Sequence, residues 1–183
     1  MNTDIFGHQA PAAGFEAPLE MLSACHARIQ DQCETLRRLL HHLASQGVDE
    51  QARQAATAVM RYFDTAAPLH HADEEVDLFP ALIESMAGSD PVCLRELAQS
   101  LGSEHRQLEA AWRRVRKGLQ QVVEGNAKAL APADVEALAT LYARHIDREE
   151  KELLPMAARL LGDAELDGVG RAMRERRGIA PIA

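Results

Sequence analysis

Aromatic residues are scarce in this sequence, at 4% of its 183 positions. Aromatic and β-branched residues are the main strand formers, whereas the abundant Ala, Leu, Glu, Gln and Arg favour helices. The hydrophobic share of 46% and the charged share of 26% are those of a globular protein. The composition therefore predicts an all-α domain of ordinary size.

The sequence has only three cysteines, without a C-x-x-C pair, and fewer basic than acidic residues. The cysteines exclude a disulfide scaffold and a cysteine-bound zinc or iron–sulfur site, and we expect a reduced, cytoplasmic compartment. The net charge of −8 argues against a nucleic-acid partner. No run reaches the roughly 18 apolar residues that span a bilayer, and no secretory signal is evident, so no membrane partner is expected.

Four long segments repeat apolar residues at steps of three and four, which is the spacing of a buried helix face. We expect helices over about residues 18–46, 50–87, 91–124 and 132–161, followed by a short helix over 163–177. The short polar connections between them predict an antiparallel up-down-up-down four-helix bundle with a short C-terminal helix. The bundle domain is expected to cover residues 17–178, between an N-terminal tail (1–16) and a C-terminal tail (179–183).

Three His-x-x-x-Glu pairs lie on these apolar faces, and a further histidine lies on the apolar face of the first helix. Residues four apart share one face of a helix, so each pair directs two ligand-type side chains the same way. A buried carboxylate is costly unless a positive charge neutralises it, and a metal core would neutralise all of them at once. The candidate metal ligands are His26, His70, Glu74, His105, Glu109, His145 and Glu149.

The second and fourth helices carry the same motif, His-x-x-x-Glu-Glu-x-x-Leu-(Phe/Leu)-Pro, at residues 70–80 and 145–155. The distance from histidine to proline is equal in the two motifs when it is counted from His70, which favours His70 over His71 as the ligand. His71 and Glu75 also stand four apart and remain an alternative pair; otherwise His71 lies at the rim, beside a ligand. Pro68 and Pro80, the proline that closes the motif, predict kinks or a break in the second helix.

The number and type of these groups indicate two metal ions. Seven imidazole and carboxylate groups exceed the four ligands of one tetrahedral zinc, and carboxylates can bridge a pair of ions. Ferritin-like di-iron bundles use Glu-x-x-His, with the opposite order and a spacing of three, so that class is disfavoured. The donor types alone do not separate iron from zinc or manganese.

The two long motifs, with Cys25-His26 and Ser103-Glu104-His105, resemble those of haemerythrin-like (HHE cation-binding) proteins over about residues 18–161. The resemblance implies a four-helix bundle that holds two non-haem iron ions as an oxo- or hydroxo-bridged di-iron centre. It also implies that Glu74 and Glu149 bridge the irons. The terminal ligands implied by the resemblance are His26, His70, His105 and His145.

Glu109 departs from the pattern, because the oxygen-carrying haemerythrins that this chain resembles have a histidine at this position. As a terminal ligand, the anionic Glu109 would favour ferric iron, and the full ligand set would leave one coordination position for a small molecule. The alternative is a solvated Glu109 beside the apolar face. We expect a protein that binds, senses or reacts with dioxygen, peroxide or nitric oxide. The rival function is a metal-binding or interaction module without redox turnover, for sensing or storage of iron or zinc.

Overall fold

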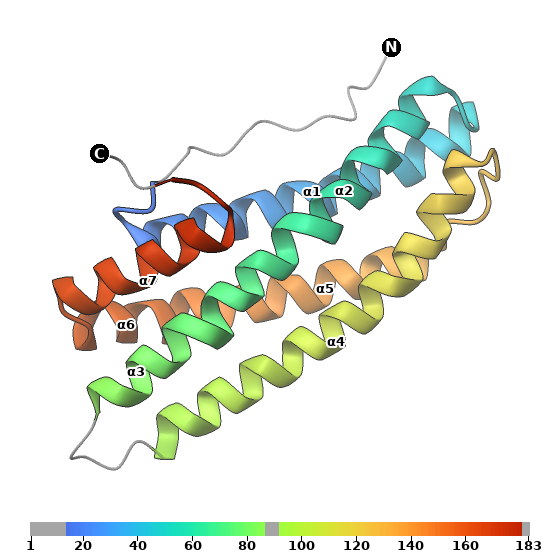
Figure 1. The fold of residues 1–183 in the computed structure, drawn as a ribbon. Coiled ribbons are helices and arrows are strands. Elements are labelled where there is room, and N and C mark those ends of the chain that lie inside the picture. The colour runs from blue at the N-terminus through green and yellow to red at the C-terminus, as the bar shows by residue number, and fades with distance from the viewer. Residues whose placement is uncertain (1–13, 87–91, 181–183) are drawn as a thin grey trace. The chain divides into compact units, whose positions relative to one another are not determined.

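The computed structural model describes residues 14–86 and 92–180, and within these ranges every regular element is a helix (Figure 1). This confirms the all-α prediction. The α-helices are α1 (Pro18–Gln46), α2 (Glu50–Ala72), α3 (Phe79–Ser85), α4 (Val92–Val123), α5 (Pro132–Arg148), α6 (Leu154–Leu160) and α7 (Asp163–Arg176). None of these helices has the length and apolar character needed to cross a membrane.

Several sequence predictions concern features that the structure leaves untested. The four-helix topology and the bounds of the bundle domain, residues 17–178, stay predictions. The expected end of the second helix near Ala87 and the Asp90-Pro91 start of the third lie outside the described residues. Most of the expected N-terminal tail, residues 1–13, lies outside them as well.

Two residues, Gly47 and Asp49, determine where α1 ends and where α2 begins. Gly47 adopts a φ of 74°, a conformation that L side chains rarely adopt, and its N–H donates to Leu43 O at 3.1 Å. The Asp49 carboxylate then accepts a hydrogen bond from Ala52 N–H at 2.8 Å. Asp49 is thus an N-cap, which satisfies a backbone donor that the first turn of a helix leaves unpaired.

The second and fourth helices are both interrupted, whereas the sequence predicted kinks or a break in the second helix alone. A π-helical segment, η1 (Asp73–Leu78), separates α2 from α3, and a second, η2 (Glu149–Leu153), separates α5 from α6. A proline lies two residues after the end of each π segment, and a proline lacks an N–H for the carbonyl four residues earlier and clashes with it in a regular helix. The wider turn avoids that clash: Phe79 N–H bonds to Glu74 O, five residues back. Pro68, where a kink was expected, lies within α2.

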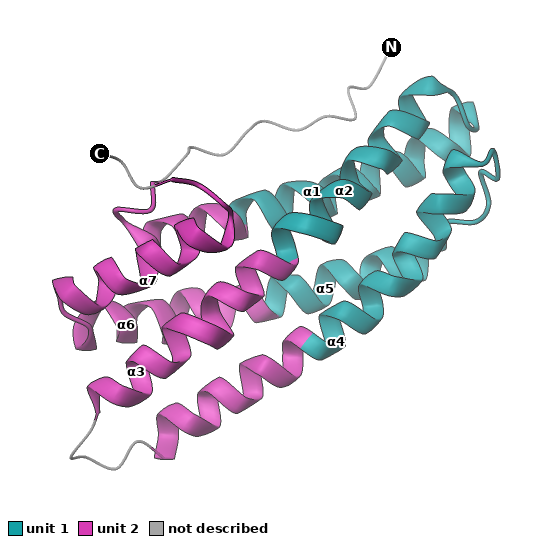
Figure 2. Ribbon diagram, in the orientation of Figure 1, with its two compact units in different colours: residues 1–10, 27–67, 106–144 teal, residues 11–26, 68–105, 145–183 magenta. Residues whose placement is uncertain are grey.

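The chain divides into two compact units (Figure 2). Among the described residues, unit 1 comprises residues 27–67 and 106–144. Its core contains Phe63, whose ring centroid lies 4.7 Å from that of Trp112 and 5.5 Å from that of Tyr142. No described histidine of this unit is buried, so its interior serves packing.

Unit 2 contains all the buried histidines of the described chain. Its described residues are 14–26, 68–86, 92–105 and 145–180. Helix α7 contacts η1 through an ion-pair cluster: the fully buried Asp73 lies 2.5 Å from Arg176 Nη1 and 2.6 Å from Arg177 Nη2. A buried carboxylate held by two guanidinium groups fixes η1 in place.

Candidate metal centre

Six of the seven predicted ligands come together inside unit 2, and none is more than 3% exposed. They are His26, His70, Glu74, His105, His145 and Glu149. Their ligand atoms form two groups, each within 4.8 Å. One group contains the α1 and α2 histidines, the other contains the α4 and α5 histidines, and both glutamates belong to both groups. We name these the His26/His70 group and the His105/His145 group.

Glu149, the first residue of η2, directs its two oxygens to different groups. Its Oε2 lies 3.1 Å from His26 Nε2, and its Oε1 lies 3.0 Å from His145 Nε2. The same Oε1 is 3.7 Å from His105 Nε2. One carboxylate therefore faces a histidine of each group, with a separate oxygen for each.

Glu74, in η1, has the same arrangement. Its Oε1 lies 3.5 Å from His70 Nε2 and 3.8 Å from His26 Nε2. Its Oε2 lies 3.2 Å from His105 Nε2. Two carboxylates that each face both histidine groups have the geometry of bridging ligands between two cations.

The unpartnered atoms of the cluster fit a cation. Both carboxylate oxygens of Glu74 and of Glu149 are buried and make no hydrogen bond to the described residues. The same holds for Nε2 of His26, His105 and His145. A native interior leaves few polar atoms unpaired, and buried carboxylates are stable only when a cation or hydrogen-bond donor offsets them. The donor set of imidazole nitrogen and carboxylate oxygen suits iron, manganese or zinc.

Three further glutamates, which we call the outer glutamates, contact the ring nitrogens that face away from Glu74 and Glu149. The pairs are His26 Nδ1–Glu150 Oε1 at 2.6 Å, His105 Nδ1–Glu75 Oε1 at 2.6 Å and His145 Nδ1–Glu104 Oε2 at 2.9 Å. An ionised carboxylate only accepts, so each Nδ1 carries a proton and donates it, and Nε2 is the nitrogen that faces the inner glutamates and can bind a cation once it is deprotonated. This carboxylate–histidine arrangement is typical of metal sites. Sequence reasoning considered Glu75 only as an alternative ligand with His71 and gave Glu104 and Glu150 no role, although the repeated Glu-Glu pair was an available signal for Glu75 and Glu150.

Each π segment contains two consecutive glutamates that serve different partners. Glu74 is fully buried in the cluster, whereas Glu75 is 41% exposed and reaches the outer nitrogen of His105. Glu149 and Glu150 divide the same two tasks in η2. π turns are rare and occur often at functional sites, because the added residue redirects side chains within a helix.

The inner charges also control protonation. Burial favours the neutral form of His26, but Glu149 and Glu74 outweigh burial and raise its pKa to about 11. Burial acts in the same direction on His105, and the same two glutamates raise its pKa to about 10. For His70, burial dominates, together with the neighbouring His26 charge, and holds its pKa well below the usual range. The two carboxylates thus attract positive charge, in the form of protons or of cations.

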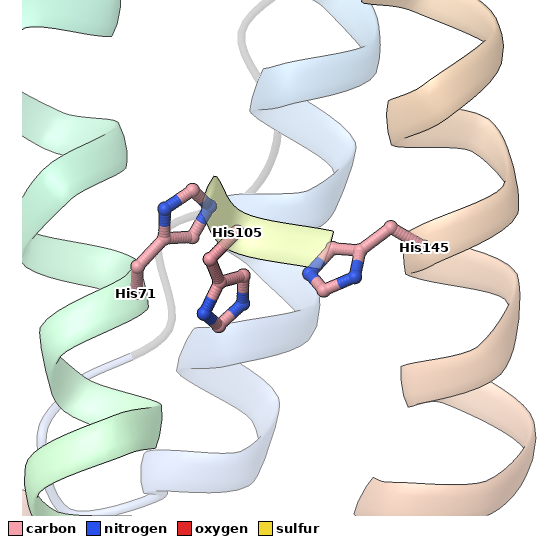
Figure 3. A group of neighbouring side chains, drawn as sticks. All are labelled: His71, His105 and His145. Atoms are coloured by element: carbon pink, nitrogen blue, oxygen red, sulfur yellow. The ribbon is translucent and has the colours of Figure 1, made fainter. Parts of the chain in front are cut away.

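The sequence left alternatives open for two further residues, Glu109 and His71. Glu109 is 61% exposed and its carboxylate lies 2.9 Å from Arg113 Nη2, so the structure does not bring it into the cluster. The preceding Leu108, 1% exposed, occupies the buried face of α4 instead. His71, in contrast, is partly buried, and its ligand nitrogen lies within 4.8 Å of those of His105 and His145 (Figure 3).

Comparison with known proteins agrees with this geometry. The family model described as the Hemerythrin HHE cation binding domain matches residues 17–157. An uncharacterized protein of Haemophilus influenzae is 30% identical over 167 residues, which cover 91% of this chain and 94% of that protein. The matched range includes every histidine and glutamate of the cluster. The chain therefore belongs to the haemerythrin HHE cation-binding domain family.

Proposed function

We propose that this chain is a non-haem di-iron protein that binds, senses or reacts with a small oxidant such as dioxygen, peroxide or nitric oxide. The observation that carries the proposal is the placement of Glu74 and Glu149, each with one oxygen toward each histidine group. Such carboxylates suit a pair of ions rather than one. Membership of a cation-binding family supports the same conclusion.

Each part of the cluster has a defined task in this proposal. Glu74 and Glu149 would bridge the two ions. The His26/His70 group would supply the terminal imidazoles of one ion, and the His105/His145 group those of the other. The outer glutamates keep the proton on Nδ1 of three rings, so that Nε2 stays available as a donor and the rings keep their orientation.

Buried leucines lie one helical turn along the chain from the proposed ligands. Leu22, Leu78, Leu101 and Leu153 are at most 1% exposed, and each lies four residues from a proposed ligand. All four belong to one apolar core within unit 2. A bound iron pair would supply one-electron redox chemistry and a coordination position for a small molecule. A buried environment of this kind strengthens the electrostatic interactions of the inner carboxylates.

Metal analysis combined with absorption spectroscopy tests the proposal. We expect about two irons per chain after aerobic purification from iron-replete cells, more than the single ion of a tetrahedral zinc site. Ferric absorption in the near-ultraviolet and visible range should bleach with dithionite and return in air. A colourless protein with one zinc per chain would instead support the rival function, a metal-binding module without redox turnover.

A further inference from the structure

The C-terminal end of α7 holds the π segment η1 at two points. Asp73, the first residue of η1, is fully buried, and its carboxylate contacts two guanidinium groups. Arg177 approaches it as a fork, with Nη2 2.6 Å from Oδ2 and Nη1 3.1 Å from Oδ1. Arg176 spans two residues of η1, with Nη1 2.5 Å from Asp73 Oδ1 and Nη2 2.6 Å from Asp77 Oδ2. The two contact points lie on either side of the consecutive glutamates of η1.

Helix α7 is itself fixed within unit 2, so it can act as a support. Val169 and Met173 are at most 3% exposed and belong to the same apolar core as Leu78, the last residue of η1. The backbone before α1 also packs directly on α7, because a Cβ at Gly170 would lie 2.1 Å from Phe15 O. The two arginines thus extend from a helix that is held by both apolar and backbone contacts.

We infer that α7 is a positioning element of the metal centre, whose arginines hold η1 at the rotation in which Glu74 enters the cluster. The inference rests on the proposed function, because it concerns the same centre. Successive side chains point in different directions around a helix, so a rotation of η1 would withdraw Glu74 from the histidines. Glu74 lies 3.5 Å from His70 Nε2 and 3.2 Å from His105 Nε2, so its displacement would weaken both metal positions. Helix α7 begins after residue 157, where the family match ends, so this support is separate from the family motif.

Substitutions that separate positioning from general stability test the inference. Asp73→Asn keeps the shape of the side chain and removes the charge that the arginines hold. Arg177→Gln is milder, because Arg176 remains on Asp73, and Arg177→Lys restores the positive charge. Asp64→Asn is the matched control: its carboxylate also accepts from two side chains, an indole at 3.0 Å and a guanidinium at 2.8 Å, but in unit 1, which contains none of the clustered ligands.

Two measurements on the full-length proteins are compared at a temperature where circular dichroism shows every metal-free variant to be folded. Hydrogen–deuterium exchange of the metal-free proteins measures the local opening of η1 and of η2. Competition with a chelator for ferrous iron, under anaerobic conditions, measures how tightly each chain retains its two irons.

If α7 positions η1, the amides of η1 exchange faster in Asp73→Asn than in wild type, whereas those of η2 do not change. Asp73→Asn should also retain both irons at least about tenfold more weakly than wild type and Asp64→Asn do. Arg177→Gln should show a smaller loss in the same direction, and Arg177→Lys should recover most of it. If Asp73→Asn does not fold, the two Arg177 variants decide by the same criterion.

Two results would overturn the inference and leave the two-iron proposal intact. If Asp73→Asn and Arg177→Gln retain both irons as tightly as Asp64→Asn does, α7 only stabilises the fold. If they weaken one iron alone, the effect does not pass through Glu74, which faces both histidine groups. A wild-type protein that takes up no iron would overturn both the inference and the proposed function.

Discussion

The outer glutamates offer the sharpest perturbation of the centre, because they act on metal affinity through a histidine. Glu150→Gln keeps the length and shape of the side chain that lies 2.6 Å from His26 Nδ1, but removes its charge. Its amide oxygen can still accept the proton, so only the charge-assisted part of the hydrogen bond is lost. Loss of such an outer partner typically weakens metal binding about 10- to 100-fold. Since Glu150 is 39% exposed and partly screened, we expect the lower end of that range.

A tenfold loss corresponds to about 1.4 kcal/mol, and competition between the protein and a chelator for ferrous iron resolves it. Glu75→Gln should give a similar loss, because its carboxylate lies 2.6 Å from His105 Nδ1. Glu96→Gln on α4 is the matched control, since Glu96 is exposed and lies about two and a half helical turns before His105 on the same helix. If Glu150→Gln binds iron as tightly as Glu96→Gln, the outer carboxylate does not support the metal site and the reasoning is wrong.

Three other predictions concern metal removal, proton release on iron uptake, and the exposed Glu109. Chelation should lower the melting temperature by several degrees, because the inner carboxylates lose their counter-charge; identical circular dichroism melting curves after verified metal removal would contradict this. Iron uptake near neutral pH should release about two protons per chain, measured in weak buffer. Burial lowers the pKa of both rings, but the inner glutamates outweigh burial and raise the pKa of His26 to about 11 and that of His105 to about 10. Both rings are then protonated before binding and neutral after it, so iron affinity should increase with pH through this range; uptake without proton release would be inconsistent with this. Glu109→Ala should match wild type in iron content and in the autoxidation rate after dithionite reduction, since that carboxylate is 61% exposed; loss of iron would restore the ligand role expected from the sequence.

The sequence predicted the elements that carry the cluster because histidines on apolar helix faces are conspicuous. His26, His70, His105 and His145 interrupt stripes of leucine and valine, and the structure buries all four. The all-α character and the N-cap at Asp49 were likewise readable from composition and local chemistry.

The prediction for Glu109 followed from treating all three His-x-x-x-Glu pairs as equivalent. Glu74 and Glu149 fall in π segments, whereas Glu109 follows His105 within the regular helix α4. In that helix the buried face steps from His105 to Leu108, which leaves Glu109 on the exposed side. Sequence periodicity does not reveal where a helix changes from four-residue to five-residue hydrogen bonding, although the prolines at equal distance in both motifs were a signal.

The sequence left the role of His71 and Glu75 open, and gave Glu104 and Glu150 no role, for a different reason. The spacing argument selected one histidine from an adjacent pair, and adjacent residues on a regular helix point about 100° apart. Only the three-dimensional placement of α4 and α5 residues shows that His71 meets His105 and His145. Contacts between residues far apart in the chain, such as His26 with Glu150, have no counterpart in local spacing.

Anomalous diffraction at the iron absorption edge, from crystals of the iron-loaded protein, tests the two-metal centre most directly. If Glu74 and Glu149 bridge two irons, the anomalous map should show two peaks, each next to one oxygen of both carboxylates. One peak should also adjoin His26 and His70, and the other His105 and His145. A single peak, or peaks away from the two glutamates, would contradict the di-iron centre.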